Sequence, residues 1–405
     1  MKFTVALGLL FLTSGFVYAK NLDQCQELLN QIENGNRLVN CENNEEGNIT
    51  YLVITNYDDP NKIPNNDYDF EYLNNLKNLK DLEQLHIFHD IPENTCITNC
   101  TRNYIETSTI KDLKNLKLLD IYGVKLSQDN IDDISTMENL ESLELDFCSF
   151  ENVKDFSSLS NLNVSFLSSL QTLNGKVINN VPVEFVYQFK NLKGLYLDYC
   201  PSLNLKQFND VEDLWIGYEE NVNDLKDFKN LRSLRISSNN DLSVLEQIES
   251  LNGLDIYKDL PIDDFDEYPY QDINFTLPEN SKITVISLRN VRVTNEDVDK
   301  FLNLKELQRL HFTHCDFSSL SDENYNILKE LGNRIFIGYY SCSFKDGMEP
   351  LNGWDDSTTT VTDYPTDYYY NDIDPEPTNY YTEYDEATDI VEIYYYPEND
   401  EPTDY

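Results

Sequence analysis

The chain has 405 residues, of which 73 are Asp or Glu and 30 are Lys or Arg, so its formal net charge is 30 − 73 = −43. Hydrophobic residues make up 40% of the chain, which is enough to form a core over most of its length. A surface this acidic repels phosphate groups and anionic lipids, and the composition therefore argues against a nucleic-acid-binding or membrane-docking protein.

Residues 1–19 have the pattern of a secretory signal peptide. Lys2 supplies the positive start, an apolar run follows, and Val17 to Ala19 form the cleavage pattern. The apolar run is too short to span a bilayer, and no later stretch is long enough to do so. We therefore expect an extracellular, secreted protein that begins near Lys20, without membrane insertion.

The body of the chain repeats the pattern L-x-x-L-x-L-x-x-(N/C/D). Clear copies run from Leu140 to Cys148, from Leu192 to Cys200, from Leu231 to Asn239 and from Leu307 to Cys315. Weaker copies begin at Ile49, Leu82, Leu116, Leu159, Val211, Leu251, Ile283 and near Gly332. About twelve irregular repeats with a mean period of about 24 residues therefore follow one another.

This pattern resembles the leucine-rich repeat family, whose consensus and period of roughly 20–29 residues it matches. The resemblance covers residues 49–344 and implies an α/β solenoid, a curved stack with a parallel β-sheet on its concave face. The chemistry agrees, because alternate side chains of a strand share one face and a single unit can bury its apolar face only against its neighbours. An all-helical solenoid is disfavoured, since the copies end in β-type segments such as residues 214–216.

The eight cysteines fall into groups with different expected roles. Residues 20–48 precede the first repeat and are expected to form an N-terminal cap, held by a disulfide between Cys25 and Cys41. Cys148, Cys200 and Cys315 occupy the turn position of the repeat, where we expect small buried side chains. The pairing of Cys96, Cys100, Cys315 and Cys342 stays open: Cys96 and Cys100 could bridge each other or stay reduced, and Cys342 could pair with Cys315 in the neighbouring repeat.

Four sequons predict N-glycosylation and agree with secretion: Asn48, Asn99, Asn163 and Asn274. Asn163 stands between Leu162 and Val164 of the fifth copy. If that copy has the register of the others, Asn163 projects from the concave face, where a glycan would obstruct a ligand.

The residues between the repeated leucines are expected to project from the concave face and to form a binding surface for a partner. Aromatic and acidic residues gather in the central copies, and Arg and His follow in the later ones. The candidate binding residues are Tyr196, Asp198, Tyr199, Trp215, Tyr218, Arg235, Tyr257, Arg289, Arg309 and His311. Exposed aromatic residues are typical of binding hot spots, but these rings could also only cover neighbouring strands, and the Arg residues could only balance nearby carboxylates.

No arrangement of residues in the sequence favours catalysis, a metal site or a cofactor. Nucleophile-elbow, metalloprotease and phosphate-loop motifs are absent from the sequence. The four His residues form two pairs about nine repeats apart, His86 with His89 and His311 with His314, and we expect them to be solvated strand residues. The sequence therefore predicts a protein that is not an enzyme.

Residues 345–405 are expected to form a disordered tail. From Asp355 onward the chain has 16 acidic residues, 11 Tyr and no Lys or Arg. Such a segment buries too little apolar surface to fold, and it could bind basic partners or Ca²⁺. Whether its Tyr residues are sulfated stays open.

Three functions are compatible with these features. The leading prediction is a secreted, non-catalytic leucine-rich repeat protein that recognises another extracellular protein through its concave face. The alternatives are a polysaccharide- or wall-binding module that uses the Tyr and Trp cluster, and a structural component of an extracellular matrix or coat.

Overall fold

The computed structural model describes residues 28, 38–44, 46–56, 76–89, 105, 107–173, 176–177, 179–200, 202–217, 222–258, 270–278 and 280–345. The predicted signal peptide, Cys25, Cys96, Asn99, Cys100, Tyr218 and the predicted tail beyond Lys345 lie outside these residues. The chain divides into two units, Met1–Asp355 and Asp356–Tyr405, and the described residues all belong to the first.

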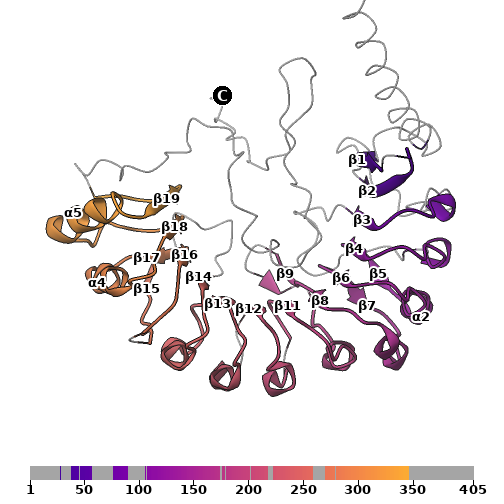
Figure 1. The fold of residues 1–405 in the computed structure, drawn as a ribbon. Coiled ribbons are helices and arrows are strands. Elements are labelled where there is room, and N and C mark those ends of the chain that lie inside the picture. The colour runs from indigo at the N-terminus through magenta and orange to yellow at the C-terminus, as the bar shows by residue number, and fades with distance from the viewer. Residues whose placement is uncertain are drawn as a thin grey trace, which may run out of the picture. The chain divides into compact units, whose positions relative to one another are not determined.

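One sheet of thirteen strands runs through the described part of this unit (Figure 1). Its first two strands pair antiparallel, and every later pair is parallel. In sheet order the strands are β1 (Leu38–Asn43), β2 (Ile49–Asn56), β3 (Gln84–His89), β4 (Leu118–Tyr122), β6 (Ser142–Glu144), β8 (Phe166–Ser168), β11 (Gly194–Leu197), β12 (Asp213–Ile216), β13 (Ser233–Ser237), β14 (Gly253–Tyr257), β16 (Val285–Arg289), β18 (Arg309–Thr313) and β19 (Phe336–Tyr340).

The twelve strands from β2 to β19 match the twelve predicted repeats. In each of them the first Leu or Ile of the L-x-L segment lies in register with its counterpart on the next strand, as Leu195, Leu214 and Leu234 do. All twelve of these side chains are buried, with at most 4% of their surface exposed. They form a continuous core column, because a single repeat cannot enclose its own apolar face.

Helical segments cover the outer side of the sheet, opposite the inner side of the curve that the strands follow (Figure 1). The central repeats begin at Leu192, Val211, Leu231 and Leu251, only 19 or 20 residues apart, and have room for short 3₁₀ turns, whereas the α-helices all lie in longer repeats. The helical segments are η2 (Thr107–Thr109), α2 (Gln128–Ile134), η3 (Ser157–Asn161), α3 (Val183–Val186), η4 (Leu205–Phe208), η5 (Val222–Asp227), η6 (Leu242–Gln247), α4 (Asn295–Asn303) and α5 (Asp322–Leu331). Three small two-stranded pairs complete the list: β5 (Lys125–Leu126) with β7 (Ser149–Phe150), β9 (Thr172–Leu173) with β10 (Lys176–Val177), and β15 (Gln271–Asp272) with β17 (Val291–Arg292).

The buried turn position contains the thiols that the sequence predicted there. Cys148, Cys200 and Cys315 are buried free thiols, and each Sγ donates to a backbone carbonyl oxygen of an earlier segment at 3.2–3.5 Å. In the repeat that begins at Leu231 the prediction was wrong by one residue. Asn239 is exposed, and the buried Asn240 takes this role by donating to the carbonyl oxygen of Gly217 at 2.7 Å.

The register predicted for the fifth repeat was also wrong. Its strand β8 places Leu167, not Leu162, in the core column beside Leu195, so this repeat begins at Val164 and not at Leu159. Asn163 therefore precedes the strand, is exposed, and accepts a hydrogen bond from the Nδ2 of Asn191 at 2.8 Å. Asn163 does not project from the concave face, because it lies at the edge where the chain enters the strand.

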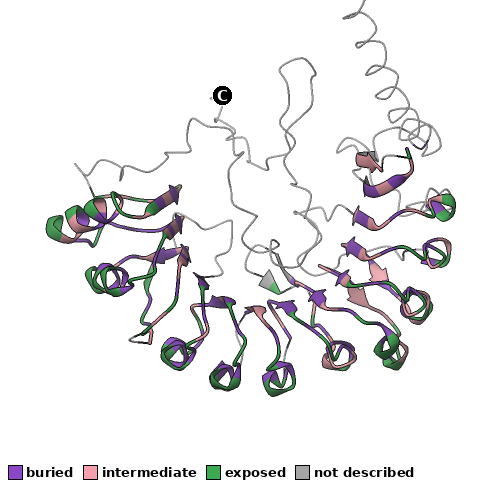
Figure 2. Ribbon diagram, in the orientation of Figure 1, coloured by how far each residue is buried: buried purple, intermediate pink, exposed green. Residues whose placement is uncertain are grey.

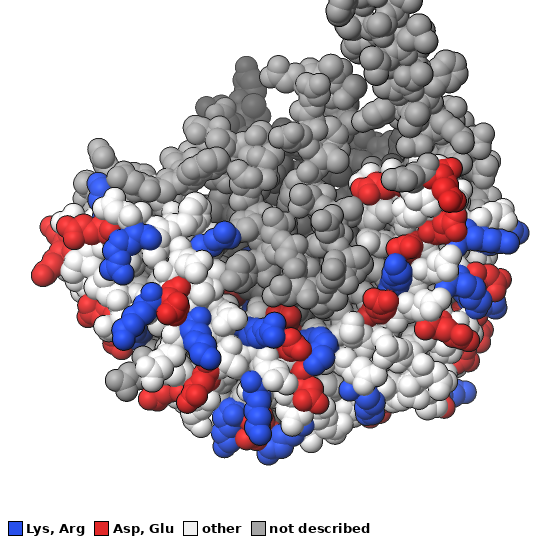
Figure 3. All heavy atoms as spheres, viewed as in Figure 1, with Lys and Arg blue, Asp and Glu red and all other residues white. Residues whose placement is uncertain are grey.

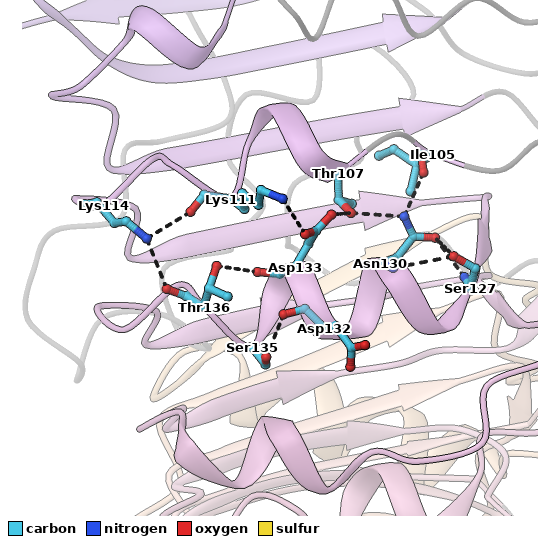
Figure 4. A network of polar contacts seen from close by, with 10 residues as sticks. All are labelled: Ile105, Thr107, Lys111, Lys114, Ser127, Asn130, Asp132, Asp133, Ser135 and Thr136. Carbon is cyan, nitrogen blue, oxygen red and sulfur yellow. Dashed lines mark hydrogen bonds and ion pairs between the residues drawn. The ribbon is translucent and has the colours of Figure 1, made fainter.

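A polar network joins α2 to the repeat before it (Figure 4). The buried Asn130 donates from Nδ2 to the carbonyl oxygen of Ile105 at 2.8 Å and to Thr107 Oγ1 at 3.0 Å. Thr107 donates in turn to Asp133 at 2.9 Å, and Lys111 donates to the other oxygen of Asp133 at 3.1 Å. The network satisfies buried polar groups between these two outer segments.

Buried residues follow the strands and the inner faces of the helical segments, and exposed residues lie on the outer surface (Figure 2). In the part of the chain that the structure describes, no helix has the length and apolar character needed to cross a membrane.

Candidate functional site: the concave face of the sheet

The inner face of the sheet presents the residues that alternate with the buried core column. One row of them, the central column, consists of the middle residues of the L-x-L segments, and these are paired in register from strand to strand. From β2 to β19 its members are Val53, His86, Asp120, Glu144, Ser168, Tyr196, Trp215, Arg235, Asp255, Ser287, His311 and Gly338.

Aromatic rings contact one another along this face. Phe166 on β8 packs edge to face on Tyr196, whose ring lies 5.8 Å from that of Trp215, measured between centroids. The Trp215 ring continues to Tyr257 at 6.3 Å, and the Trp215 Nε1 donates to the Tyr257 hydroxyl at 3.2 Å. These contacts place the rings in fixed positions across the strands from β8 to β14.

The N-terminal half of the face is aromatic and acidic. His86 is buried and its Nδ1 lies 2.9 Å from an Asp120 carboxylate oxygen, with the Tyr51 ring 5.3 Å away between centroids. The prediction that His86 is a solvated strand residue was therefore wrong. Phe88 and Tyr122 extend this aromatic contact towards β6.

Carboxylates crowd one another beside this cluster. Burial and the neighbouring charges of Asp120 and Asp146 raise the pKa of Glu144 well above its usual range. Burial raises the pKa of Asp146 to about 7, although its hydrogen bond from the backbone of Leu170 acts in the opposite direction. The acidic half of the face therefore retains protons near neutral pH.

Two acidic side chains, Asp146 and Asp198, accept hydrogen bonds from the chain where it leaves β8. Asp146, after β6, accepts from the backbone N–H of Leu170 and from Ser168 Oγ, both at 2.8 Å. Asp198, after β11, accepts from the backbone N–H of Gln171 at 2.6 Å. The strands on both sides of β8 thus supply carboxylates for the backbone donors of the turn that follows it.

The C-terminal half of the face contains arginines around one buried carboxylate. Asp255 is fully buried in the central column of β14, and its Oδ2 lies 3.5 Å from the Nε of Arg235 and 3.1 Å from the Nε of Arg289. The Arg235 guanidinium stacks on the Trp215 ring, 3.7 Å from its centroid, and lies 5.0 Å from the Tyr257 centroid.

His311 lies on the next strand but one from Asp255. Burial lowers its pKa to about 4, and the charges of Arg309 and Arg289 act in the same direction, while Asp255 opposes them. His311 is therefore neutral near pH 7, chiefly because it is buried.

The structure brings most of the predicted binding residues onto this face, but it buries several of them. Tyr196, Asp198 and Tyr257 are buried, with 9%, 8% and 5% of their surface exposed. The half-buried members are Tyr199, Trp215, Arg235, Arg289, Arg309 and His311, and Tyr218 lies outside the described residues.

The sequence analysis missed Asp255. It stands in the pattern Leu254-Asp255-Ile256, where the same alternation that selected Tyr196 and Trp215 selects it as well. Because Asp is frequent throughout this chain, one Asp within a repeat did not by itself indicate a binding residue.

The arrangement is suited to binding rather than to a recognised chemistry. Among the described residues, no group of His, Cys, Asp and Glu could hold a metal ion. Lys and Arg side chains lie beside Asp and Glu over the described part of the visible surface, so the net negative charge does not form one continuous region there (Figure 3).

The repeated L-x-x-L-x-L unit, the parallel sheet in register and the outer helical segments define the fold as a leucine-rich repeat solenoid. No family model and no curated protein matches the sequence.

Solved structures with a similar fold include three bacterial leucine-rich repeat proteins. Internalin C2 of Listeria monocytogenes is 18% identical with a TM-score of 0.33, and the match covers 52% of this chain and 81% of the internalin. Internalin inlF of the same organism is 16% identical with a TM-score of 0.35, covering 73% and 82%. A leucine-rich repeat protein of Leptospira interrogans is 16% identical with a TM-score of 0.28, covering 67% and 81%.

Proposed function

We propose that the protein is a secreted, non-catalytic recognition protein that binds another extracellular protein through the concave face of its sheet. The observation that carries this proposal is the row of aromatic and charged side chains along the central column, from His86 to His311. Aromatic residues and Arg contribute most of the energy in protein interfaces, and strands in register hold them at fixed spacing.

The crowded carboxylates support a protein partner with basic groups. Like charges held close together in a partly buried site raise one another's pKa, as Asp120 and Asp146 do for Glu144. A Lys or Arg side chain of a partner would relieve this repulsion and return the carboxyl groups to their charged form. The acidic half of the face therefore favours a basic segment.

The polysaccharide alternative has weaker support. Sugar rings stack on open, flat aromatic surfaces, but the Arg235 guanidinium already covers a face of the Trp215 ring. Tyr196 and Tyr257 are buried and present little ring surface. A matrix or coat role has no specific observation in its favour.

Secretion and glycosylation belong to the same proposal. Asn163 and Asn274 are exposed, which favours their use as glycan acceptors, whereas the half-buried Asn48 donates its amide to Asp81. Cys41 is half-buried and is not one of the four free thiols of the described chain, which supports the proposed bridge to Cys25 and an oxidising compartment.

Site-specific photocrosslinking tests the proposal. A photoreactive amino acid at Ser287, in the central column, should crosslink the immobilised protein to the same extracellular partner in repeated experiments. The matched control carries the photoreactive amino acid at the exposed Lys229, on the outer side after η5. Equal crosslinking from both positions, or capture of insoluble polysaccharide that Trp215→Ala abolishes, would contradict the proposal.

A further inference from the structure

The strongest unexplained feature of the concave face is the ion pairing around Asp255. Two arginines approach the same oxygen through Nε, at 3.5 Å for Arg235 and 3.1 Å for Arg289. Neither oxygen of Asp255 accepts a hydrogen bond from any of the described residues. A buried carboxylate that the described residues contact only through loose ion pairs gains little folding stability from them, which indicates another role for the cluster.

Arg235 is held in one orientation by its neighbours. Its guanidinium contacts the rings of Trp215 and Tyr257, and the Trp215 Nε1 donates to the Tyr257 hydroxyl, which in turn donates to the carbonyl oxygen of Ile216 at 3.4 Å. A guanidinium fixed in this way loses little conformational entropy when it binds a second group.

Counted over the described residues, the cluster remains positive despite its carboxylate. Arg235 and Arg289 carry two positive charges against the single negative charge of Asp255, and Arg309 adds a third on β18. The side chains of Arg235 and Arg289 are 21% and 33% exposed, so a ligand can reach them. Arg289 and Arg309 also lower the pKa of His311, although burial is the larger cause.

The same face limits the kind of anion that fits. The central column continues to Asp120 and Glu144, and Asp146 lies beside Glu144. An extended polyanion that covered the arginines and continued along the face would meet these carboxylates and be repelled. A short acidic segment of a protein avoids them.

We propose that Arg235, Arg289 and Arg309 bind a short acidic segment of the partner protein, with its carboxylates on the guanidinium groups and its apolar atoms against Trp215. Asp255 acts as a positioning residue that orients Arg235 and Arg289, and its negative charge offsets part of their positive charge. The proposal rests on the proposed function, because it identifies the part of the partner that the C-terminal half of the face recognises.

Binding of a labelled peptide of alternating Glu and Tyr to the full chain tests this assignment, with the matching Gln and Tyr peptide as the reference. At low salt the Glu peptide should bind the more tightly, and Arg289→Gln should weaken it about fivefold to tenfold. Arg232→Gln is the matched control, because Arg232 is an exposed arginine at the start of β13 that pairs with Glu212. It should change the affinity less than twofold.

Asp255→Asn separates a binding role from a purely structural one. It removes the internal negative charge at nearly constant shape, so the Glu peptide should bind a few-fold more tightly. Three outcomes would each overturn the proposal. The first is an equal loss of affinity in Arg289→Gln and Arg232→Gln, and the second is equal binding of the Glu and Gln peptides. The third is heparin binding that depends on Arg289 while the Glu peptide does not bind. If the Glu peptide does not bind but Ser287 still crosslinks a partner and Lys229 does not, the assignment of an acidic segment is wrong while the proposed protein recognition stands.

Discussion

The guanidinium carbon of Arg235 lies 3.7 Å from the ring centroid of Trp215, its register partner on the neighbouring strand. Twenty residues separate the two in the chain, and the parallel register alone places them in contact. The pair joins the aromatic half of the concave face to the arginine half, and it explains why a half-buried Trp and a half-buried Arg hold defined positions.

Trp215→Ala should lower the free energy of unfolding by about 1–3 kcal/mol, because it removes the cation–π contact and the ring contacts with Tyr196 and Tyr257. Urea unfolding measures this. Trp215→Phe keeps a ring but loses the hydrogen bond to Tyr257, and it should cost less than the Ala variant. Equal losses for both variants would show that the ring contacts are unimportant.

Asp146→Asn should be more stable than the parent protein at pH 8 and nearly equal to it at pH 4. The pKa of Asp146 is raised to about 7, so between pH 4 and 7 the folded protein holds a proton that the unfolded chain releases. Stability from this group is therefore lost as the pH rises through that window, by about 1–3 kcal/mol, and Asn removes the loss while keeping an oxygen for Leu170.

Thermal unfolding of both proteins across pH 4 to 8 measures this difference. Asp155→Asn is the control, because hydrogen bonds from Ser157 lower the pKa of Asp155 and the stability from its charged form is lost only below about pH 4, so its difference from the parent protein should not change between pH 4 and 8. A stability difference between parent and Asp146→Asn that does not change with pH would contradict the prediction.

Cys315 and Cys342 should form a disulfide when the protein is oxidised mildly. They are free thiols that follow the neighbouring strands β18 and β19, the backbone N–H of Cys315 donates to the Cys342 Sγ at 3.4 Å, and the adjacent Asp316 and Ser343 form a bridge. Neighbouring strands lie about 4.8 Å apart, which fits the Cα separation that disulfides adopt. A hydrogen bond with Cys315 lowers the pKa of Cys342, which favours its thiolate.

Mass spectrometry of non-reduced peptides detects this bridge. Cys148 is the internal control and should stay reduced, since no other cysteine among the described residues lies in its own repeat or in an adjacent one. Complete alkylation of Cys342 after oxidation would exclude the disulfide.

Asn130→Ala should lower the free energy of unfolding by about 1–3 kcal/mol, because it leaves the carbonyl oxygen of Ile105 and the hydroxyl of Thr107 without their buried donor. It also removes the side chain that accepts from the backbone N–H of Ser127 at the start of α2. Glu138→Ala, at an exposed position after α2, is the control and should change stability by less than about 0.5 kcal/mol. Chemical denaturation compares the two.

Asn163→Gln should leave partner binding unchanged, whether or not the parent protein carries a glycan there. Asn163 lies before β8 and bonds to Asn191, away from the central column. Crosslinking yield from Ser287, measured for the glycosylated protein and for the variant, tests this. A marked rise in yield for the variant would show that a glycan at residue 163 obstructs the face.

The amino-acid sequence by itself predicted the repeat architecture. A leucine pattern that recurs twelve times specifies one buried column, and the physical demand that each repeat stack on the next leaves few alternatives. The same pattern located the thiols at 148, 200 and 315, and it selected most of the concave-face residues by strand alternation.

Local irregularities decided the points where sequence reasoning failed. In the repeat that begins at Leu231, one extra residue moved the buried turn position from Asn239 to Asn240. In the fifth repeat, Leu159 and Leu162 match the leucine pattern, but the strand begins later, at Phe166. Periodicity cannot distinguish two leucine registers that are a few residues apart, because only the packing against the neighbouring strand determines which one is buried.

Only the tertiary structure decided what the net charge of −43 means for the concave face. In the sequence, Asp120, Glu144 and Asp255 are ordinary members of an acidic composition. The sheet register places Asp120 beside Glu144, whose pKa it raises, and it places Asp255 between two arginines. Charge interactions depend on distance and burial, which the order of residues along the chain does not specify until the strands are aligned.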